Sequence, residues 1–488
     1  MPNQSSTKMS VKIKCAFCLL FLFSFYNTKS SAQDLRKVLT LDEFFNVVLQ
    51  NHPLAKQANL LTQVAKQNLI VAHGGFDPYF FSNLYQRQYD GQEYLFLNKS
   101  GFKVPLWYGI DISGSYNINR GELLNPEHSM PAEGRAVLGI SAPIGQGLFM
   151  DERRSVLKQA KIFREASEFE RIGMLNDLLF FATKDYWDWT MHYNNYTILN
   201  TALTAAQERF EGFRNSFKSG EIPAIDTVEA FTQLQNIQFN LNEALLNYRN
   251  SSLTLSNHLW LENEVPIELT DAIIPPSLDA MTFNPKLTLD SITQITNSIA
   301  QYHPDIKQIQ LKINQLDIER RLKLEFLKPK INVNYNLLSK EQFAFNTNPQ
   351  TGNPFNTNYK WGFDIAFPLL WSQGRGNYKL AKLKIQDAEY KLDLKNVEVA
   401  NKIKTYFNEL IILKDQVTLY QDATNNYNRL LSAEIIKFEA GESSIFLINA
   451  RQMKLIEFQS KLLEVKTKYL KALAGVAWAS GTLYRNGN

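Results

Sequence analysis

The stretch Phe217-Lys218-Ser219-Gly220-Glu221 returns in the second half of the chain as Phe438-Glu439-Ala440-Gly441-Glu442. The match continues beyond the glycine, where apolar residues stand at spacings of three and four in both copies. The paired positions are Leu234, Ile237, Leu241, Ala244 and Tyr248 with Leu455, Phe458, Leu462, Val465 and Tyr469. Because this spacing is typical of one face of an α-helix, the sequence predicts a glycine turn and a return helix, written twice.

A heptad pattern precedes each glycine turn. No proline occurs between Arg153 and Phe217, and apolar or aromatic residues recur there at intervals of seven. They are Leu175, Ala182, Trp189, Tyr196, Leu203, Phe210 and Phe217. Residues 399–431 keep the same alternation of four and three. A helix of about 65 residues would measure roughly 97 Å at 1.5 Å per residue, so the sequence predicts two long antiparallel helical hairpins.

Earlier markers repeat as well, at an offset of 251 residues. Asn51-His52-Pro53 returns as Tyr302-His303-Pro304, and Pro78 returns as Pro329. The two halves therefore form one unit written twice, with about 30 additional residues after Pro78 in the first copy. We expect a first repeat over 33–286, with strands at about 76–144, a long helix at about 151–217 and a return helix at about 223–260. The expected second repeat covers 287–488, with the corresponding elements at about 330–368, 375–438 and 443–478.

Alternating sequence in each copy predicts β-strands. Ile331, Val333, Tyr335 and Leu337 alternate with asparagines, so one face of the strand is apolar and the other polar. Taken alone, this pattern favours a soluble sandwich, because strand patterns are far commoner in soluble proteins. The neighbouring helices favour another interpretation, because an exported protein with helices of roughly 100 Å joined to short strands could cross the space between two membranes. Strands in an outer membrane must close into a barrel, and so few strands require several chains.

The N-terminus predicts export. Three lysines precede the apolar run Cys15 to Tyr26, and Ser30, Ser31 and Ala32 follow it, which is the layout of a secretory signal peptide over residues 1–32. Cleavage after Ala32 would leave 456 of the 488 residues. It would remove four lysines, bring the net charge from +4 to zero, and remove both cysteines. The mature chain could then form no disulfide.

Composition and motifs exclude several classes of function. A net charge of +4 gives no basis for nucleic-acid binding, and outside the N-terminus there is no apolar run of about 18 residues. The six histidines show no paired metal spacing, no glycine-rich phosphate loop follows a strand, and no carboxylate is paired with a nucleophile. We therefore expect no enzymatic activity, no cofactor and no metal site.

Taken together, these features resemble the TolC-like family of outer membrane efflux and secretion channels. The order of helix, hairpin, long helix, glycine turn and return helix, written twice after a signal peptide, covers nearly all of the mature chain. The markers beyond those quoted above are Phe76-Asp77-Pro78, the passage 143–149 with Asp151-Glu152-Arg153-Arg154, Pro368-Leu369-Leu370-Trp371 with Gly374-Arg375-Gly376, and Gly220 with Asp226 and Ala230.

The resemblance implies an α+β membrane protein that acts as a homotrimer. Each chain would give four strands to a shared 12-stranded outer membrane β-barrel, continuous with a periplasmic α-helical barrel. It implies a passive exit duct in a tripartite efflux or type I secretion system, surrounded by outer membrane lipid. A periplasmic adaptor protein and an inner-membrane RND or ABC transporter would be its partners.

The resemblance also places the aperture of the duct at the two glycine turns. It assigns Gly220, Asp226, Gly441, Glu442 and Asn449 to this periplasmic tip. The second turn departs from the family's best-known pattern, because Leu447 and Ala450 stand where that pattern has acids and Ser443 where it has an arginine. Asn449 and Glu442 are the polar alternatives at that turn.

A second hypothesis of another class uses the same elements. An exported periplasmic coiled-coil scaffold could carry the long helices, with its strands forming a soluble cap and no pore. The two hypotheses predict different locations, a trimer in the outer membrane or a soluble periplasmic monomer.

Overall fold

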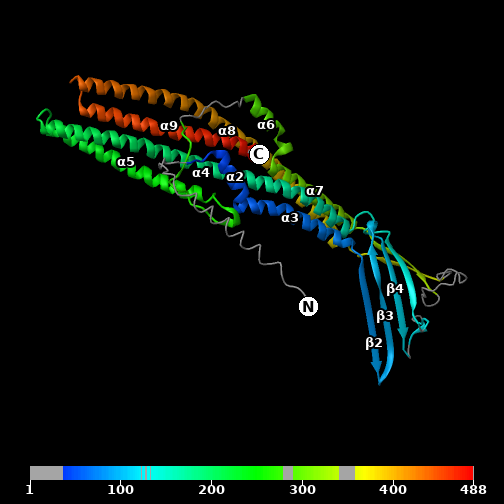
Figure 1. Cartoon of the computed structure of the whole chain (residues 1–488). Coiled ribbons are helices and arrows are strands. Elements are labelled where there is room, and N and C mark those ends of the chain that lie inside the picture. The colour runs from blue at the N-terminus through cyan, green and yellow to red at the C-terminus, as the bar shows by residue number, and fades with distance from the viewer. Residues whose placement is uncertain are drawn as a thin grey trace, which may run out of the picture.

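The computed structural model describes residues 37–121, 124–126, 129–131, 133–278, 289–339 and 358–486. The predicted signal peptide, its cleavage site after Ala32 and the boundary expected between residues 286 and 287 lie outside these ranges. The described part is elongated, with long helices at one end and a β-sheet at the other (Figure 1).

Helices make up most of the chain, in the order that the duplication predicts. In the first copy they are α2 (Leu41–Asn51), α3 (Pro53–His73), α4 (Glu152–Lys218) and α5 (Ala224–Ser256). In the second they are α6 (Leu289–Tyr302), α7 (Pro304–Glu325), α8 (Ser372–Glu439) and α9 (Ile445–Ala479), followed by α10 (Leu483–Asn486). Helices α4 and α8 have 67 and 68 residues, which corresponds to roughly 100 Å each.

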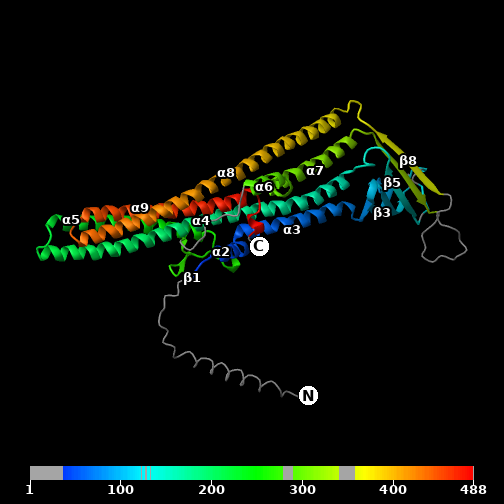
Figure 2. The ribbon, with the colours of Figure 1, turned by 90° about the horizontal axis from the view of Figure 1, so that it is seen from above.

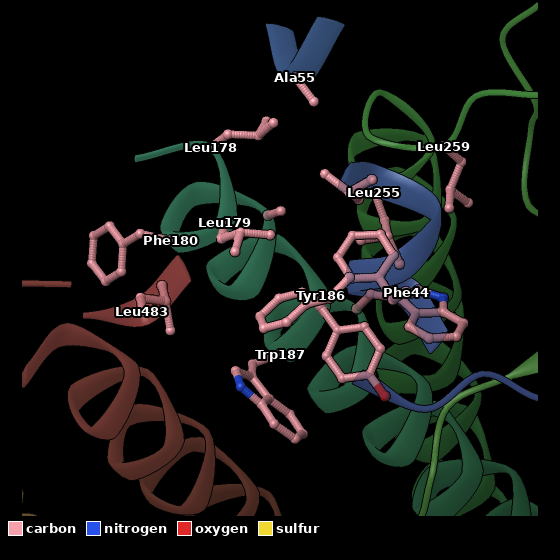
Figure 3. Packing of buried hydrophobic residues seen from close by; sticks show 14 of the residues in the cluster. Phe44, Ala55, Leu178, Leu179, Phe180, Tyr186, Trp187, Leu255, Leu259 and Leu483 are labelled. Carbon is pink, nitrogen blue, oxygen red and sulfur yellow. The ribbon is translucent and has the colours of Figure 1, made fainter. Parts of the chain in front are cut away.

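Helix α4 is the centre of the helical part. It packs against α3 and α7 on the side of the sheet, and against α5 and α9 toward the far end, while α8 lies along α7 and α9 (Figure 2). The largest core lies about midway along α4, where Phe44 stacks on Tyr186 with ring centroids 5.4 Å apart (Figure 3). Tyr186 and Trp189 of the heptad seam are fully buried. Large aromatic side chains suit this seam because it contacts several helices.

Side-chain caps explain where the short helices begin. Thr40 and Glu43 form the predicted capping box at the start of α2, with hydrogen bonds of 3.3 and 3.2 Å. Both histidines of the repeated His-Pro motif cap a helix through the imidazole Nδ1. In α3, His52 accepts from the amide of Leu54 at 3.1 Å, and in α7, His303 accepts from the amide of Asp305 at 3.2 Å. The following proline takes the first helical position, where no backbone donor is needed.

The main sheet contains strands from both copies. Its order is β2 (Tyr79–Tyr89), β3 (Gln92–Pro105), β4 (Asp111–Arg120), β5 (Arg135–Pro143), β7 (Lys330–Leu338) and β8 (Tyr359–Ala366), and all neighbours are antiparallel. A separate parallel pair joins β1 (Lys37–Val38) to β6 (Ile273–Ile274). The predicted fold class, a duplicated unit of helix, β-hairpin and long helical hairpin, is confirmed.

The strand count differs from the four per chain that the resemblance implies. Strands β2 and β7 follow the matched prolines Pro78 and Pro329, and β5 and β8 lead into the long helices, so β3 and β4 are the additional pair. They contain the extra length after Pro78. The β3–β4 turn returns beside the helices, where Trp107 stacks on Phe76 with centroids 5.3 Å apart. One chain therefore gives six strands to a single sheet.

The two histidine caps predict loss of stability in acid. Burial lowers the pKa of His52 and His303 below the ordinary value of 6.5, and nearby His258 and Lys402 lower the two values further. The capping Nδ1, which accepts its hydrogen bond only when unprotonated, is thereby kept neutral. The folded state then binds fewer protons than the unfolded state, so the free energy of unfolding falls as the pH drops through about 6.5. Asparagine also caps helices and does not titrate.

We therefore expect the double variant His52→Asn/His303→Asn to lose less stability than wild type between pH 7.5 and 5. Urea unfolding of the detergent-solubilised protein at both pH values measures this difference. The exposed His73, replaced by asparagine, is the matched control. Equal pH dependence in all three proteins would contradict the assignment.

Candidate functional site

The six-stranded sheet has two chemically different faces. The register places Ile112, Ile140 and Tyr335 side by side on neighbouring strands, with Trp361 next to Tyr335. Further members of this apolar face are Phe80, Phe102, Leu138, Val333, Leu337, Phe363 and Ile365. Many of them are exposed in the single chain. Such a face is suited to contact lipid.

The opposite face is polar across β4, β5, β7 and β8, whereas β2 and β3 also place Phe81 and Leu97 on it. Ser113 pairs with Gly139, Gly139 with Asn336, and Asn336 with Lys360. The next level toward the helices contains Asp111, Ser141 and Asn334, and further levels contain Asn332 with Asp364 and Lys99 with Asn117. An apolar face opposite a polar one is the pattern of a strand between lipid and an aqueous lumen.

Both edges of the sheet lack a partner strand. Strand β2 pairs only with β3, and β8 only with β7, in the described part of the chain. A row of unpaired backbone groups is available on each edge to bind another strand. In lipid such edges leave N–H and C=O groups unsatisfied, at a cost of several kcal/mol per group.

A buried arginine organises the passage from β5 into α4. Asp151 caps α4 by accepting from the amide of Arg154 at 2.8 Å, and its carboxylate also accepts from the Arg154 guanidinium at 3.1 Å. The same guanidinium donates to the carbonyl of Leu148 at 3.0 Å. Only 3% of Arg154 is exposed. The passage that marks the family in the sequence is therefore a hydrogen-bonded joint between sheet and helix.

The second copy carries a related joint at the start of α8. Arg375 donates to the carbonyl of Leu370 at 2.7 Å, and Trp371 has a left-handed backbone with φ of 55°. Arg154 and Arg375 are separated by 221 residues, which is also the offset between the two glycine turns. The arginine thus belongs to the repeated unit, a correspondence that the sequence comparison missed because the surrounding residues differ.

The outer helices carry apolar stripes that nothing in the described chain covers. On α8, Leu383, Tyr390, Leu394 and Val397 follow one another at intervals of seven, four and three, and 60% of Leu394 is exposed. The opposite side of the molecule has comparable stripes. These are Leu60, Val64 and Val71 on α3, and Phe239, Leu246 and Leu253 on α5. Heptad stripes of this kind are the surfaces by which long helices pack on one another.

The two glycine turns lie together at the end away from the sheet. Gly220 and Gly441 both have φ of 78°, a left-handed conformation that glycine adopts without a Cβ penalty. After each glycine, a backbone amide bonds back to the helix, from Glu221 to Ser216 at 2.9 Å and from Glu442 to Lys437 at 2.8 Å. Phe213, Ala230 and Ile445 form a small core that joins the two turns.

The predicted polar residues of the tip have different environments. Asp226 lies in the first turn of α5, where the helix dipole favours a carboxylate, and Glu442 is exposed directly after Gly441. Asn449 is buried, with 4% exposed, and its amide Nδ2 lies 3.5 Å from Glu229 Oε1 of α5. Asn449 thus joins the two helical hairpins within one chain instead of facing solvent.

The structure adds polar residues that sequence reasoning missed. Ser443 donates to the Glu434 carboxylate at 2.6 Å, and Arg451 lies 3.6 Å from it. These contacts hold the pKa of Glu434 below its ordinary value. Further up, Arg209 of α4 donates to Gln452 of α9. The one available signal was the serine at position 443, whose partner Glu434 lies nine residues earlier, inside the last two turns of α8.

Two other kinds of site were sought. Within the described ranges, no cluster of three or more histidine, cysteine, aspartate or glutamate side chains could hold a metal ion. Across those same ranges, every helix is either too short or too polar to cross a membrane.

Comparison with known proteins places these features in a family context. Residues 295–482 match the family described as outer membrane efflux protein. A search of curated proteins finds no match. Among solved structures, the CmeC outer membrane channel of Campylobacter jejuni shares 15% identity and has a TM-score of 0.64, with 91% of this chain and 86% of that chain covered. The MtrE outer membrane channel of Neisseria gonorrhoeae, in its open state, shares 13% identity with a TM-score of 0.63, and 94% of each chain is covered.

The match to the outer membrane efflux protein family thus covers most of the second repeat. The similarity to solved channels covers the fold of nearly the whole chain. The resemblance to TolC-like channels, inferred from the sequence motifs, is confirmed.

The joint at Arg154 gives a prediction on stability. Replacing Arg154 by methionine keeps the length of the side chain but removes the guanidinium that donates to the Asp151 carboxylate and to the carbonyls of Gly147 and Leu148. We expect a loss of about 3 kcal/mol in the free energy of unfolding, measured by urea titration in detergent with tryptophan fluorescence. The control is Arg321→Met, whose ion pair with Asp317 is 61% exposed on the arginine side and should contribute below about 1 kcal/mol. Equal losses in the two variants would contradict a special role for Arg154.

Proposed function

We propose that this chain is the outer membrane exit duct of a tripartite efflux or type I secretion system. The observation that carries the proposal is the two-faced sheet, apolar on one side and polar on the other, joined directly to helices of roughly 100 Å. Substrates would pass along the polar face without chemical change. A periplasmic adaptor and an inner-membrane RND or ABC transporter would deliver them and supply the energy.

Three copies would close one barrel in the outer membrane. The free edge of β8 in one copy would pair with the free edge of β2 in the next, which satisfies both rows of backbone groups. With six strands from each of three chains, the barrel would contain eighteen strands. This exceeds the twelve that the resemblance implies, because each chain carries the additional strands β3 and β4.

The helical stripes support the same assembly. The stripe on α8 lies on one side of the chain, and the stripes on α3 and α5 lie on the other, so each copy would present complementary faces to its two neighbours. A head-to-tail contact of this kind closes into a ring when the rotation between copies divides a full turn. The ring of helices would form the periplasmic barrel.

The aperture would lie at the glycine turns, at the end of the helices farthest from the sheet. Gly220 and Gly441 shape the turns, and Asp226 and Glu442 would offer charge to the adaptor or to passing ions. Asn449 would act one layer inside, where it ties the two hairpins together. Opening the aperture would require these hairpins to move relative to each other.

This role needs no cofactor, metal ion or catalytic residue. It places the sheet in the outer membrane and the helices in the periplasm, after removal of the signal peptide at Ala32. It also treats residues 33–286 and 287–488 as two copies of one structural unit. The duct and the scaffold alternative both require export to the periplasm. Insertion into the outer membrane and pore formation distinguish the duct from the scaffold.

Fractionation and deletion test the proposal. We expect the protein in the outer membrane fraction as a trimer that requires detergent for extraction and changes mobility on heating. We also expect the deletion strain to be more susceptible to some members of a panel of toxic compounds, or to fail to secrete a polypeptide. Recovery as a soluble periplasmic monomer would overturn the proposal and favour the scaffold.

The exposed stripe on α8 gives a specific prediction on assembly. Leu394→Lys places a charge at the proposed contact between copies, without entering the core of its own chain. We expect monomers on native electrophoresis and size exclusion in detergent, with an unchanged circular dichroism spectrum. The control Glu389→Lys introduces the same side chain on the same helix, away from the stripe, and should leave the trimer intact. A trimeric Leu394→Lys variant would argue against this contact.

A further inference from the structure

The polar face of the sheet carries an excess of basic side chains. Lys99, Lys103, Arg135, Lys330 and Lys360 all share this face by the register of the strands. Acidic residues on the same face of these strands are fewer, Asp111 and Asp364. The face is therefore positively charged where the proposed lumen would be.

The basic residue closest to an acid is already paired. Lys103 Nζ lies 2.9 Å from Asp111 Oδ2, and Arg153 Nη1 lies 3.0 Å from Asp111 Oδ1, so two cations offset this carboxylate. Asp364 accepts from the Asn334 amide at 3.0 Å. Lys99 and Lys360 are exposed. The positive charge of the face is thus carried chiefly by side chains that extend toward the solvent.

The register brings these charges to adjacent levels of the sheet. Lys103 of β3 and Lys360 of β8 lie in one row across the sheet, with Ser113, Gly139 and Asn336 between them. Two rows farther from the helices, Lys99 and Arg135 lie on either side of Asn117. A hollow of about 400 Å³ is lined by Lys99, Lys103 and Lys360 together with Ser113 and Asn336.

Gly139 allows polar side chains to converge at the centre of this row. A Cβ added there would collide with Asn336 Oδ1 and lie 2.8 Å from Ser113 Oγ. The amide and the hydroxyl therefore occupy the space above the glycine, between the two lysines of the row. A hydroxyl, an amide and flanking ammonium groups are donors suited to an anion.

We propose that the strand-built section of the duct is a cationic filter that binds and preferentially passes anions, including anionic substrates. This proposal rests on the proposed function, because the polar face forms a lumen only when the sheets close. Rings of lysine and arginine select anions in pores by the same electrostatics. Closure of the ring would bring the copies of Lys99 and Lys360 around one axis and focus their field.

Reversal potentials test the proposal. Purified full-length protein is placed in a planar lipid bilayer with a tenfold KCl gradient, and the potential at zero current is measured. We expect the sign of the reversal potential to indicate a preference for chloride. This preference should be weaker at 1 M salt than at 0.1 M, because the Debye length falls from about 10 to about 3 Å. Lys99→Glu/Lys360→Glu should reverse the sign, whereas Lys99→Arg/Lys360→Arg should preserve it. Cation preference in wild type, or a sign that the Glu variant leaves unchanged, would overturn the filter.

If the tip of the channel is closed and no current flows, a binding measurement tests the same proposal. Calorimetric titration of the detergent-solubilised trimer with tripolyphosphate should show binding in wild type and in the Arg variant, and loss of binding in the Glu variant. Absence of binding in wild type would overturn the filter while leaving a conducting trimer, and hence the proposed function, intact. A protein that forms neither trimer nor pore would overturn the proposed function itself.

Discussion

In the proposed assembly, the requirement that backbone polar groups be satisfied in lipid governs the structure. A single chain ends in a sheet with two free edges, β2 and β8, and with an apolar face that many exposed aromatic and aliphatic side chains cover. The free edges are unfavourable in hydrocarbon, and the exposed apolar face is unfavourable in water. The long helices show the same incompleteness, since the stripes on α8 and α5 remain uncovered. In the proposed assembly, one chain is a segment of a ring, and its core of Phe44, Tyr186 and Trp189 stabilises only that segment.

The joint between sheet and helices sets how the two parts of the proposed duct are connected. Arg154 and Arg375 bind carbonyl groups at the point where each strand becomes a long helix, at the same place in both copies. Because the guanidinium is planar and has several donors, it can fix a turn that the backbone alone would leave unsatisfied. The direction of α4 and α8 relative to the sheet follows from these joints. The glycine turns at the other end then reverse the chain and bring both hairpins to one tip.

Much of this fold could be predicted from the sequence. The heptads from Leu175 to Phe217, the two glycine turns and the His-Pro pairs are local patterns, and local patterns determine helices, turns and caps directly. The six-stranded sheet could not be counted in advance, because Phe102 to Asn119 reads as strand without revealing its partners. The burial of Asn449 was also hidden, since its partner Glu229 lies 220 residues away. The sequence predicted a polar face, but its row of lysines could be recognised only once the register aligned Lys103 with Lys360.

Counting strands in the assembled particle tests the central claim most directly. Single-particle electron cryomicroscopy of the protein extracted from outer membranes would show how many chains surround the pore and how their edges meet. The account predicts a closed ring of three chains, with β8 of each copy paired to β2 of the next and all six strands of each sheet in the wall. A particle whose sheets stay open, or a single chain without a central pore, would contradict it.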